Sequence, residues 1–496
     1  MSMKSILCAL LAVGLSVSAA YAEPSVNRSG SSITVNESLT DDGISQVKEL
    51  AGQIKTPTFK LQNIKDADLV KFCQAFPDVA SLYIKAKEGE LTSIAPVAGL
   101  KNLTSFEMEA ESVKDLSPLA GLTKLTELDV TCPNMGPDLK WMSGMTSLKK
   151  VAIFGGSSLT SLEGFPALQG NPRISIGGAA LADLSPIQNL TSSRFELLEC
   201  TIQDLSPLAK MPNLTDLSLY GSSVKDFSPL ANCTKLKSLT YYAVKDADFS
   251  TLKALKQVTE LKGGLTDLDN ISFVSELPAL RTFEVFAEYV TDYSPLGSSK
   301  VEKLQIWSMN APCDLSGVGK AKTLKELKLW SVDDATNSAA LAGLTELEKF
   351  TITSNYNENS GQPFDMASAK GWGKLKEMSI TDAKVINTKD NMGALTSLQR
   401  LTLNEVNKEG EPFSLAGLTK LANLESVSIN KSQVTDFEGL SGCTGLVYIE
   451  MKNTKGVTSL APLKALPNLK RIVVSKGAFP DSELSGFAET VKIEQR

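Results

Sequence analysis

The sequence feature that most constrains the fold is an apolar pattern, L-x-x-L-x-L, which recurs along almost the whole chain of 496 residues. Residues 214–235, LTDLSLYGSSVKDFSPLANCTK, show one complete unit. Most units begin 21 to 24 residues after the previous one, and the steps after Leu347 and Leu398 are 28 and 26 residues. A unit this short cannot cover its own leucines, so neighbouring units must stack into a solenoid. The pattern begins at Val79, Leu103, Leu125, Leu148, Asn171, Ser192, Leu214, Leu236, Val258, Leu280, Val301, Leu324, Leu347, Leu375, Leu398, Leu424, Leu446 and Leu469.

Each unit has two halves with different expected local structure. In the first half, apolar residues alternate as in L-x-L, which is the two-residue period of a strand with one buried face. The second half contains DLSPL at residues 115–119 and 204–208. Because serine is a favoured N-cap residue and proline is tolerated at the next position, we expect the serine to cap a helical turn. Variants are DLSPI at residues 183–187, DFSPL at 226–230, DYSPL at 292–296 and SLAPL at 459–463.

Together the two halves predict an α/β repeat solenoid, with a parallel β-sheet on the concave side and short helical or 3-10 segments on the convex side. The units resemble leucine-rich repeats of the bacterial internalin type, in which about 22 residues carry the signature LSPLAGLTKL. The resemblance covers about residues 56–496. It implies a leucine-rich-repeat horseshoe with a binding surface and no reaction. Known internalins usually add a domain after the repeats and a wall anchor, and neither is visible in this sequence.

One departure from that family concerns the turn after the strand. The family usually places asparagine eight residues after the first leucine of a unit, where the side chain bonds backbone groups of the turn. In this sequence Asn355 is the asparagine at that position, and the other units have different residue types there. We therefore expect the turn to be satisfied in another way. The residues at that position include Glu111, Ser222, Val244, Thr266, Met309, Val332, Ser432 and Thr454.

The N-terminal residues match a secretory signal. Lys4 supplies a positive charge, an apolar run follows over residues 6–17, and residues 20–22 form an A-x-A cleavage site, so the predicted signal peptide is residues 1–22. No later apolar run approaches the ~18 residues that a membrane span needs. We therefore expect an exported protein that is periplasmic, at the cell surface or secreted.

Residues 23–55 lie between the signal and the array. We expect them to form a polar leader and an N-terminal helical cap, because residues 41–54 have helical apolar spacing and Thr40 is a candidate N-cap. The repeat array is then expected over residues 56–480. Residues 481–496 would close the stack as a C-terminal capping repeat.

The composition excludes several kinds of functional site. The chain has no histidine, which removes the usual general base, the Ser-His triad and every histidine-containing metal site. Its net charge of −6 argues against a nucleic-acid partner, which would require a basic face. We therefore expect no enzyme activity, no cofactor and no nucleic-acid ligand.

The cysteines are expected to be free thiols. They are irregularly spaced and include no C-x-x-C pair. Cys233 and Cys443 stand where neighbouring units have leucine, which indicates small buried apolar residues. Cys132 and Cys200 are three registers apart, so stacking at ~4.8 Å per strand would hold them about 14 Å apart, beyond the reach of a disulfide. After the signal peptide the cysteines are Cys73, Cys132, Cys200, Cys233, Cys313 and Cys443.

Two short segments resemble ligand loops but do not match them. GVGKAKT at residues 317–323 lacks the first glycine of a phosphate loop, and Ala321 stands where Ser or Thr would hold magnesium. NYNENSG at residues 355–361 has oxygen-bearing side chains at alternate positions, but its glycine is one place late for a calcium loop and most ligands would be neutral amides. We expect a convex return segment and a solvated insertion, and no metal site.

An aromatic row becomes visible once the register is set. The residue directly after the last strand leucine is aromatic in five of six consecutive units from residue 220 to residue 330, although aromatic residues are only 6% of the chain. Stacking at ~4.8 Å would align them as a stripe roughly 24 Å long, interrupted at Gly264 and ended by the polar Thr353. The aromatic residues are Tyr220, Tyr242, Phe286, Trp307 and Trp330.

Two interpretations of this row stay open. The rings pack on one another and stabilise the sheet, or they are exposed anchors for a ligand. Flanking positions carry mixed charges, which suit a protein partner, while a bare stripe would equally suit stacking on sugar rings. We predict a non-enzymatic binding protein that recognises a macromolecular ligand, with a protein as the first choice, through the concave sheet. The alternatives are a structural or scaffolding envelope protein and a glycan-binding adhesin-like module. The flanking candidates are Lys262, Glu284, Lys303 and Lys328.

Overall fold

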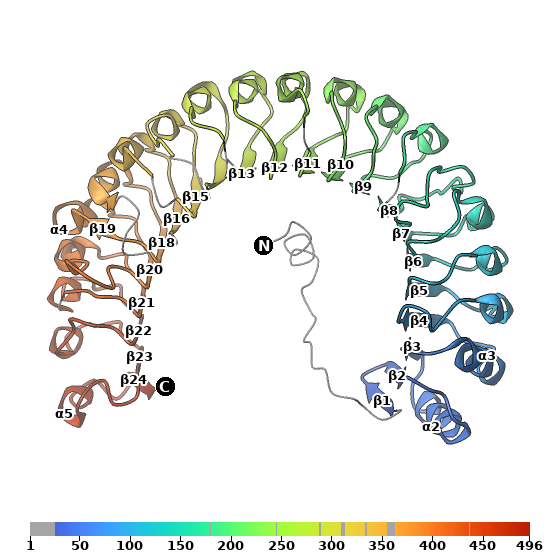
Figure 1. Ribbon diagram of the computed structural model, residues 1–496. Helices are drawn as coiled ribbons and strands as arrows, with labels where there is room; N and C mark the ends of the chain where they lie inside the picture. The colour runs from blue at the N-terminus through green and yellow to red at the C-terminus, as the bar shows by residue number, and fades with distance from the viewer. Residues whose placement is uncertain are drawn as a thin grey trace. The chain divides into compact units, whose positions relative to one another are not determined.

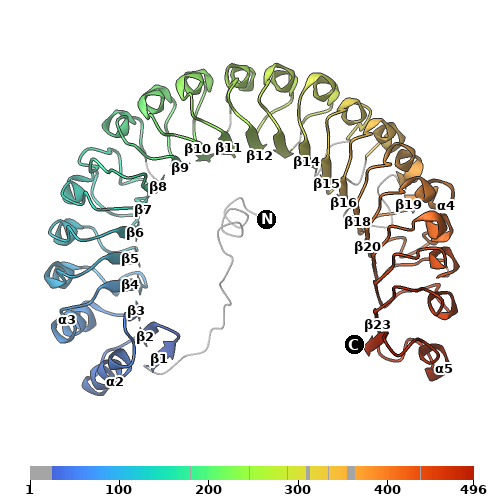
Figure 2. The same ribbon diagram turned by 180° about the vertical axis from the view of Figure 1, so that it is seen from behind.

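The computed structural model describes residues 25–496 except residues 179, 245, 287–288, 309–312, 333–334, 355–362 and 436. The predicted signal peptide and the segment 355–361 therefore lie outside the described residues. Contacts within the chain divide it into two compact units, Met1–Ser158 and Leu159–Arg496. In each unit, Figures 1 and 2 show strands along one side of a solenoid and helical turns along the other.

The first unit begins with an antiparallel hairpin and continues as a parallel ladder. Strand β1 (Ser25–Ser29) lies in the segment predicted as a polar leader, and Gly30, with a left-handed φ of 60°, forms the tight turn that follows it. Helix α2 (Asp41–Gly52) follows, and the Thr40 side chain accepts a hydrogen bond from the Gly43 N–H at 3.1 Å, as the sequence predicted. The strands are β1 (Ser25–Ser29), β2 (Ser32–Asn36), β3 (Thr58–Gln62), β4 (Ser81–Ala86), β5 (Ser105–Ala110), β6 (Glu127–Thr131) and β7 (Lys150–Phe154).

The second unit is a longer parallel ladder of the same kind. Each strand pairs in register with the next, and a small two-stranded sheet, β17 (Phe364–Asp365) with β19 (Val385–Ile386), lies outside the ladder. The ladder strands are β8 (Arg173–Gly177), β9 (Arg194–Leu198), β10 (Asp216–Tyr220), β11 (Ser238–Tyr242), β12 (Glu260–Gly264), β13 (Thr282–Phe286), β14 (Lys303–Trp307), β15 (Glu326–Trp330), β16 (Lys349–Thr353), β18 (Glu377–Thr381), β20 (Arg400–Asn404), β21 (Ser426–Asn430), β22 (Tyr448–Lys452), β23 (Arg471–Val474) and β24 (Lys492–Gln495).

The return segments are mostly short 3-10 turns, as predicted. In the first unit they are α3 (Asp66–Ala75), η1 (Ala95–Gly99), η2 (Ser117–Leu119) and η3 (Lys140–Met142). In the second unit they are η4 (Ser185–Ile187), η5 (Ser206–Lys210), η6 (Ser228–Asn232), η7 (Phe249–Ala254), η8 (Ser272–Glu276), η9 (Ser294–Ser298), η10 (Val318–Lys320), η11 (Ser338–Gly343), η12 (Met366–Gly371), α4 (Thr388–Asn391), η13 (Met392–Ala394), η14 (Ala416–Lys420), η15 (Phe437–Leu440), η16 (Ala461–Leu463) and α5 (Asp481–Leu484).

The leucine register predicted the strands correctly. At every register start named above, a strand begins two residues later, so Leu214 leads to β10 at Asp216. Within β10, Leu217 and Leu219 are buried, whereas Asp216, Ser218 and Tyr220 are half-buried on the opposite face. This alternation recurs along the ladder. The buried leucine, isoleucine, valine and phenylalanine side chains fill the interior between the sheet and the return segments.

Backbone groups satisfy many of the turns that follow the strands. After several strands the next residue takes a left-handed conformation, for example Gly221 with φ 63° and Ala243 with φ 54°. Its N–H donates to the next strand: Gly221 to the Tyr242 carbonyl at 2.8 Å, and Ala243 to the Gly264 carbonyl at 2.9 Å. Backbone groups of neighbouring units therefore satisfy one another, and the following position is free to hold a small buried residue such as Ser222.

The predicted serine cap is wrong by one position. In η2 the N-cap is Leu116 and the serine is the first residue of the turn. The capping side chain is Asp115, whose carboxylate accepts from the Ser117 N–H at 2.8 Å. Aspartate is the cap because it lies two residues before the first N–H of the turn, whereas the serine is already inside the turn. Where a serine holds the aspartate's place, as Ser459 does, its hydroxyl accepts the same kind of bond, from the Ala461 N–H at 3.1 Å. The same contact, at 2.7–2.8 Å, joins Ser185 to Asp183, Ser206 to Asp204, Ser228 to Asp226 and Ser294 to Asp292.

These caps make stability sensitive to acid. Hydrogen bonds from the serines lower the pKa of Asp183, Asp204 and Asp226. A lowered folded-state pKa gives stability that is complete above the ordinary Asp pKa of about 3.9 and is lost as pH falls through the folded value. We expect the urea concentration at the unfolding midpoint to decrease as the pH is lowered from about 5 to about 3, and to decrease less steeply after Asp→Asn replacement at these three positions. An equal decrease of the urea midpoint with pH in the two proteins would contradict this account.

The cysteine prediction agrees with the described residues. The six described cysteines form no disulfide and are all buried: Cys73, Cys132, Cys200, Cys233, Cys313 and Cys443. Cys233 and Cys443 fill leucine positions, at 2% and 0% exposure, and burial raises the pKa of each thiol to about 11. Their Sγ atoms donate to the carbonyls of Leu208 and Leu418. They act as small apolar residues of the core.

The glycine-rich segment 317–323 has a packing role. Residues 318–320 form η10, and Ala321 is fully buried. A Cβ on Gly319 would overlap the backbone carbonyl of Ala340 in the next return segment. The glycines therefore allow neighbouring turns to approach closely, which explains them without a phosphate ligand.

Candidate binding surface

The aromatic row lies on the side of the second unit's sheet that faces away from the buried leucines, which we call the outer face. We call Tyr220, Tyr242, Gly264, Phe286, Trp307 and Trp330 the aromatic column. Each is the last residue of its strand, from β10 to β15. The strand register pairs Tyr220 with Tyr242, Phe286 with Trp307, and Trp307 with Trp330. The parallel ladder therefore brings together side chains that are 21 to 23 residues apart in sequence.

The rings pack against one another along the column. The rings of Tyr220 and Tyr242 are stacked, with centroids 5.9 Å apart and planes 7° from parallel. The centroids of Phe286 and Trp307 are 5.8 Å apart at 37°, and those of Trp307 and Trp330 are 5.6 Å apart at 33°. Such pairs stabilise neighbouring strands beyond the area that they bury. The contacts between the rings therefore account for part of the role of the aromatic column, as the packing interpretation predicted.

Gly264 does not leave an empty step in the column. A Cβ at this position would overlap the Phe286 Cβ and would lie 2.8 Å from the Tyr242 Cε1. The space of the missing side chain is thus already filled by its two aromatic neighbours. Gly264 is required for Tyr242 and Phe286 to come together, and the interruption that the sequence indicated is a close contact.

The column also reaches solvent. Trp307 is 37% exposed, and the other aromatic members are half-buried. Burial, with a contribution from the nearby Glu284 carboxylate, raises the pKa of Tyr242 to about 12, so its hydroxyl is neutral at physiological pH. Burial, and next Glu196, likewise raises the pKa of Tyr220. Both residues present a neutral phenol to any ligand.

The four predicted flanking residues lie beside the column on the same face. Lys262 contacts Glu260 at 2.7 Å and Glu284 at 3.8 Å. Lys328 and Lys303 contact Glu326 at 2.9 Å and 3.8 Å. The lysines are therefore held by carboxylates of their own or neighbouring strands. Glu260 was missed by the sequence reasoning, although its place two residues before Lys262 in a strand puts both on one face.

A shallow depression lies within this charged region. Its volume is about 210 Å³. Its side chains come from β12–β15, the strands that also carry the middle of the column. The aromatic column and the depression therefore form one continuous candidate surface. The outward-facing residues that line the depression are Glu260, Thr282, Glu284, Lys303, Gln305, Glu326 and Lys328.

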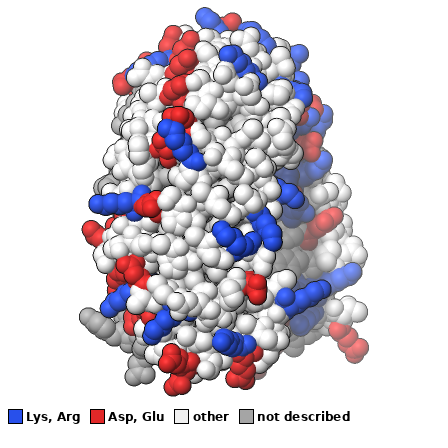
Figure 3. Space-filling view, turned by 90° about the vertical axis from the view of Figure 1, so that its right-hand side faces the viewer, with Lys and Arg blue, Asp and Glu red and all other residues white. Residues whose placement is uncertain are grey.

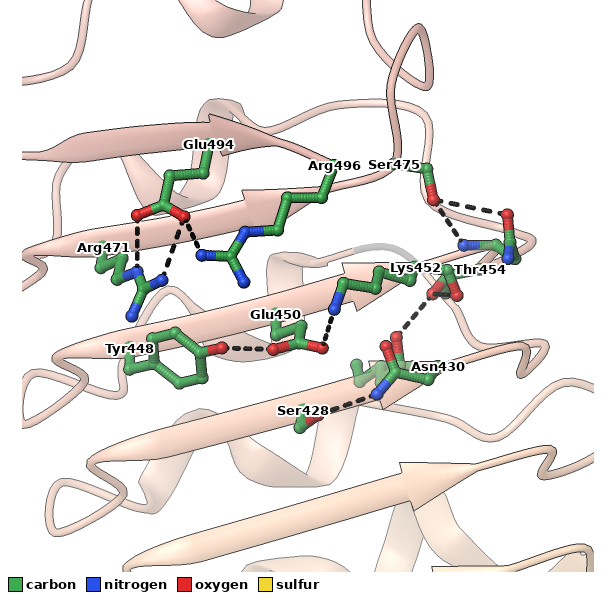
Figure 4. Close-up of polar contacts among 12 residues, drawn as sticks. Ser428, Asn430, Tyr448, Glu450, Lys452, Thr454, Arg471, Ser475, Glu494 and Arg496 are labelled. Atoms are coloured by element: carbon green, nitrogen blue, oxygen red, sulfur yellow. Dashed lines mark hydrogen bonds and ion pairs between the residues drawn. The ribbon is translucent and has the colours of Figure 1, made fainter. Parts of the chain in front are cut away.

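Beyond Thr353 the same face becomes polar. On β21–β24, shown in Figure 4, side chains form paired networks. Glu494 accepts two hydrogen bonds from Arg471, each at 3.0 Å, and these with Lys492 and Arg496 lower its pKa to about 2. Glu450 is paired with Lys452 at 2.8 Å and with the Tyr448 hydroxyl. This part of the sheet is a natural source of control variants.

The described residues offer no obvious site for other chemistry. Among them, no group of three or more Cys, Asp or Glu side chains is placed to hold a metal ion. None of their helices has the length and apolar composition needed to cross a bilayer. On the face seen in Figure 3, acidic and basic side chains are interspersed.

Comparison with known proteins identifies the fold. No family model matches the chain, and no curated protein matches its sequence. Among solved structures, it is similar to TLR13 in complex with ssRNA13, at 15% identity over 93% of this chain and 76% of that one, with a TM-score of 0.52. It is also similar to an internalin, InlF of Listeria monocytogenes, at 19% identity over 80% and 88% of the two chains, with a TM-score of 0.34. A leucine-rich-repeat protein of Leptospira interrogans matches at 13% identity over 87% and 99%, with a TM-score of 0.38.

The match to TLR13 agrees with the repeat solenoid described above. At such low identity it bears on the fold alone. The chain has the leucine-rich-repeat fold.

Proposed function

We propose that this chain is a non-enzymatic binding protein that recognises a protein ligand through the outer face of the second unit's sheet. The observation that carries the proposal is the aromatic column, a partly exposed apolar strip bordered by charged residues. Aromatic side chains dominate the energetic centres of protein interfaces. Because neighbouring rings and strands already fix these side chains, little conformational entropy is lost on binding.

Ring orientation favours a protein over a sugar. Tyr220 and Tyr242 turn their faces toward each other along the column, and the tryptophans are tilted by 33°. Tyr220 and Tyr242 thus cover one face of each other's rings, whereas stacking on sugars requires an open face. An apolar strip bordered by mixed charges suits the apolar and polar groups of a polypeptide. A scaffolding role is the second candidate, because the ring contacts by themselves stabilise the sheet.

Nucleic acid is a less suitable ligand for this surface. The chain carries a net charge of −6, and Lys262 and Lys328 are both paired with carboxylates. A phosphate backbone would have to displace these carboxylates. TLR13, which shares the fold, is complexed with ssRNA13, so the binding experiment should include a single-stranded RNA.

Export is also part of the proposal. It rests on the signal-like residues 1–22, which support a location in the periplasm, at the cell surface or in the medium. The absence of histidine from the sequence supports a role without acid-base catalysis.

The test compares the double variant Trp307→Ala/Trp330→Ala with Asn404→Ala/Asn430→Ala. The asparagines hold the corresponding strand-end positions on β20 and β21, outside the column. Both variants and the unmodified chain are exposed to a displayed peptide library, a glycan array and a single-stranded RNA. We expect peptide binding that weakens at least about a hundredfold in the tryptophan variant only, as for hot-spot residues.

Circular dichroism and urea titration serve as the folding control. If the tryptophan variant stays folded and binds peptides as the unmodified chain does, the surface is wrongly assigned. If it unfolds while the asparagine variant does not, the column serves stability and scaffolding is favoured. Binding confined to the glycan array would replace the protein ligand by a carbohydrate.

A further inference from the structure

Glu284 differs from the other carboxylates of the depression in how it is paired. Glu260 contacts Lys262 at 2.7 Å and accepts from the Ser238 hydroxyl at 3.0 Å. Glu326 contacts Lys328 at 2.9 Å. Among the described residues, the cation contact of Glu284 is a longer one, 3.8 Å to Lys262. Glu284 is therefore the least closely paired carboxylate of the depression.

The surroundings of Glu284 are suited to a cation. Glu284 lies two residues before Phe286 on β13, so both point to the outer face about 7 Å apart. Its charge also reaches the ring of Tyr242, where it contributes to the raised pKa of that phenol. A cation at Glu284 would therefore form a charge-assisted hydrogen bond with a carboxylate that lies directly beside the column.

The nearby lysines do not fill this place. Lys262 is drawn to Glu260, and Lys328 and Lys303 are drawn to Glu326 on the other side of the depression. Glu260 and Glu284 thus share one lysine, Lys262, whereas Glu326 alone contacts two, Lys303 and Lys328. The volume of about 210 Å³ is open to solvent beside the column and leaves room for a long side chain.

We propose that the depression receives a basic side chain, arginine or lysine, of the polypeptide that binds the aromatic column. This inference rests on the proposed function, since it names the chemistry of the ligand for the same surface. The ligand's apolar side chains pack on the rings at Trp307 and Trp330. One cationic side chain reaches from that segment toward Glu284.

The experiment selects a displayed random peptide library on three proteins in parallel: the unmodified chain, Glu284→Gln, and Glu450→Gln. Glu450 is the matched control, because it holds the same strand position on β22 outside the column and is paired with Lys452. We expect peptides selected on the unmodified chain and on Glu450→Gln to contain apolar residues with Arg or Lys at a fixed spacing. Selection on Glu284→Gln should retain the apolar residues and lose the basic one.

A second readout uses one selected peptide and its citrulline analogue, which keeps the shape of arginine without the charge. Titration calorimetry should show the analogue bound about ten- to a hundredfold more weakly by the unmodified chain, and both peptides bound alike by Glu284→Gln.

The possible outcomes separate the two proposals. If the selected peptides lack a basic residue, or if citrulline weakens binding equally for both proteins, the cationic subsite is wrong. The binding function still stands in that case, provided that Trp307→Ala/Trp330→Ala abolishes binding of the peptides. If the peptides bind the tryptophan variant as tightly as the unmodified chain, the proposed function itself is overturned.

Discussion

Replacing Gly263 by alanine is expected to destabilise the second unit by about 3 kcal/mol, at the upper end for an overpacked core. Gly263 lies on the core side of β12, in register with Tyr241 of β11. Tyr241 is fully buried, and a Cβ on Gly263 would fall within its ring, with the hydroxyl oxygen only 2.5 Å away. Phe227 and Phe249 pack against the same ring and oppose its displacement. Urea titration followed by tryptophan fluorescence measures the loss.

The rescue variant makes the mechanism specific. Tyr241→Leu removes the ring and restores the residue type found at Leu219 in the preceding strand. Alone it leaves a cavity over Gly263 and costs about 2 kcal/mol. Combined with Gly263→Ala it should cost less than the sum of the single variants, with a coupling energy of about 1–3 kcal/mol.

Tyr241→Phe is the control for this cycle. It keeps the ring and removes only the buried hydroxyl, which has no hydrogen-bond partner among the described residues. By itself it should be neutral or slightly stabilising, because an unpaired buried donor is removed. It should not rescue Gly263→Ala. Additive losses for Tyr241→Leu and Gly263→Ala would show that the overlap does not cause the instability.

The two glycines of β12 illustrate what the sequence could and could not reveal. The leucine period fixed which residues face the core, because apolar burial follows a pattern local to each unit. The pairs Tyr241–Gly263 and Tyr242–Gly264 depend instead on contact between successive units, and they were not recognised as pairs. Read in register, a tyrosine beside a glycine is a signal of size compensation, once in the core and once on the outer face.

The candidate surface was predicted in a similar, partial way. Its aromatic members and flanking lysines could be placed because strand position alone determines which face a residue occupies. The ion pairs could not be predicted from strand position, because both Glu260 and Glu284 lie near Lys262. The side-chain conformations decide which carboxylate the lysine contacts more closely. The capping of the return turns was misassigned for a related reason. In DLSPL both the aspartate and the serine are plausible caps, and the backbone geometry decides for aspartate.

Alanine at Gly371 is expected to cost at least about 3 kcal/mol, because the obstacle is backbone and cannot rotate away. Gly371 ends η12, and Ala342 lies in η11, the preceding return segment. A Cβ on Gly371 would overlap the Ala342 carbonyl oxygen and lie 2.6 Å from its carbonyl carbon and 2.9 Å from its Cα. The two return segments would have to separate, so the loss should spread to both repeats. Urea titration and hydrogen exchange of residues 338–371 would detect it.

Gly373 provides a matched control two residues away. A Cβ there would meet no atom within 4 Å, and its backbone is outside the left-handed region. Gly373→Ala should therefore leave the urea midpoint unchanged or raise it slightly, since alanine reduces the entropy of the unfolded chain. Because both variants add the same methyl group to the same repeat, the difference between them isolates the contact with Ala342. Equal midpoints for the two variants would mean that the convex turns tolerate separation, and that the sheet side alone holds these repeats together.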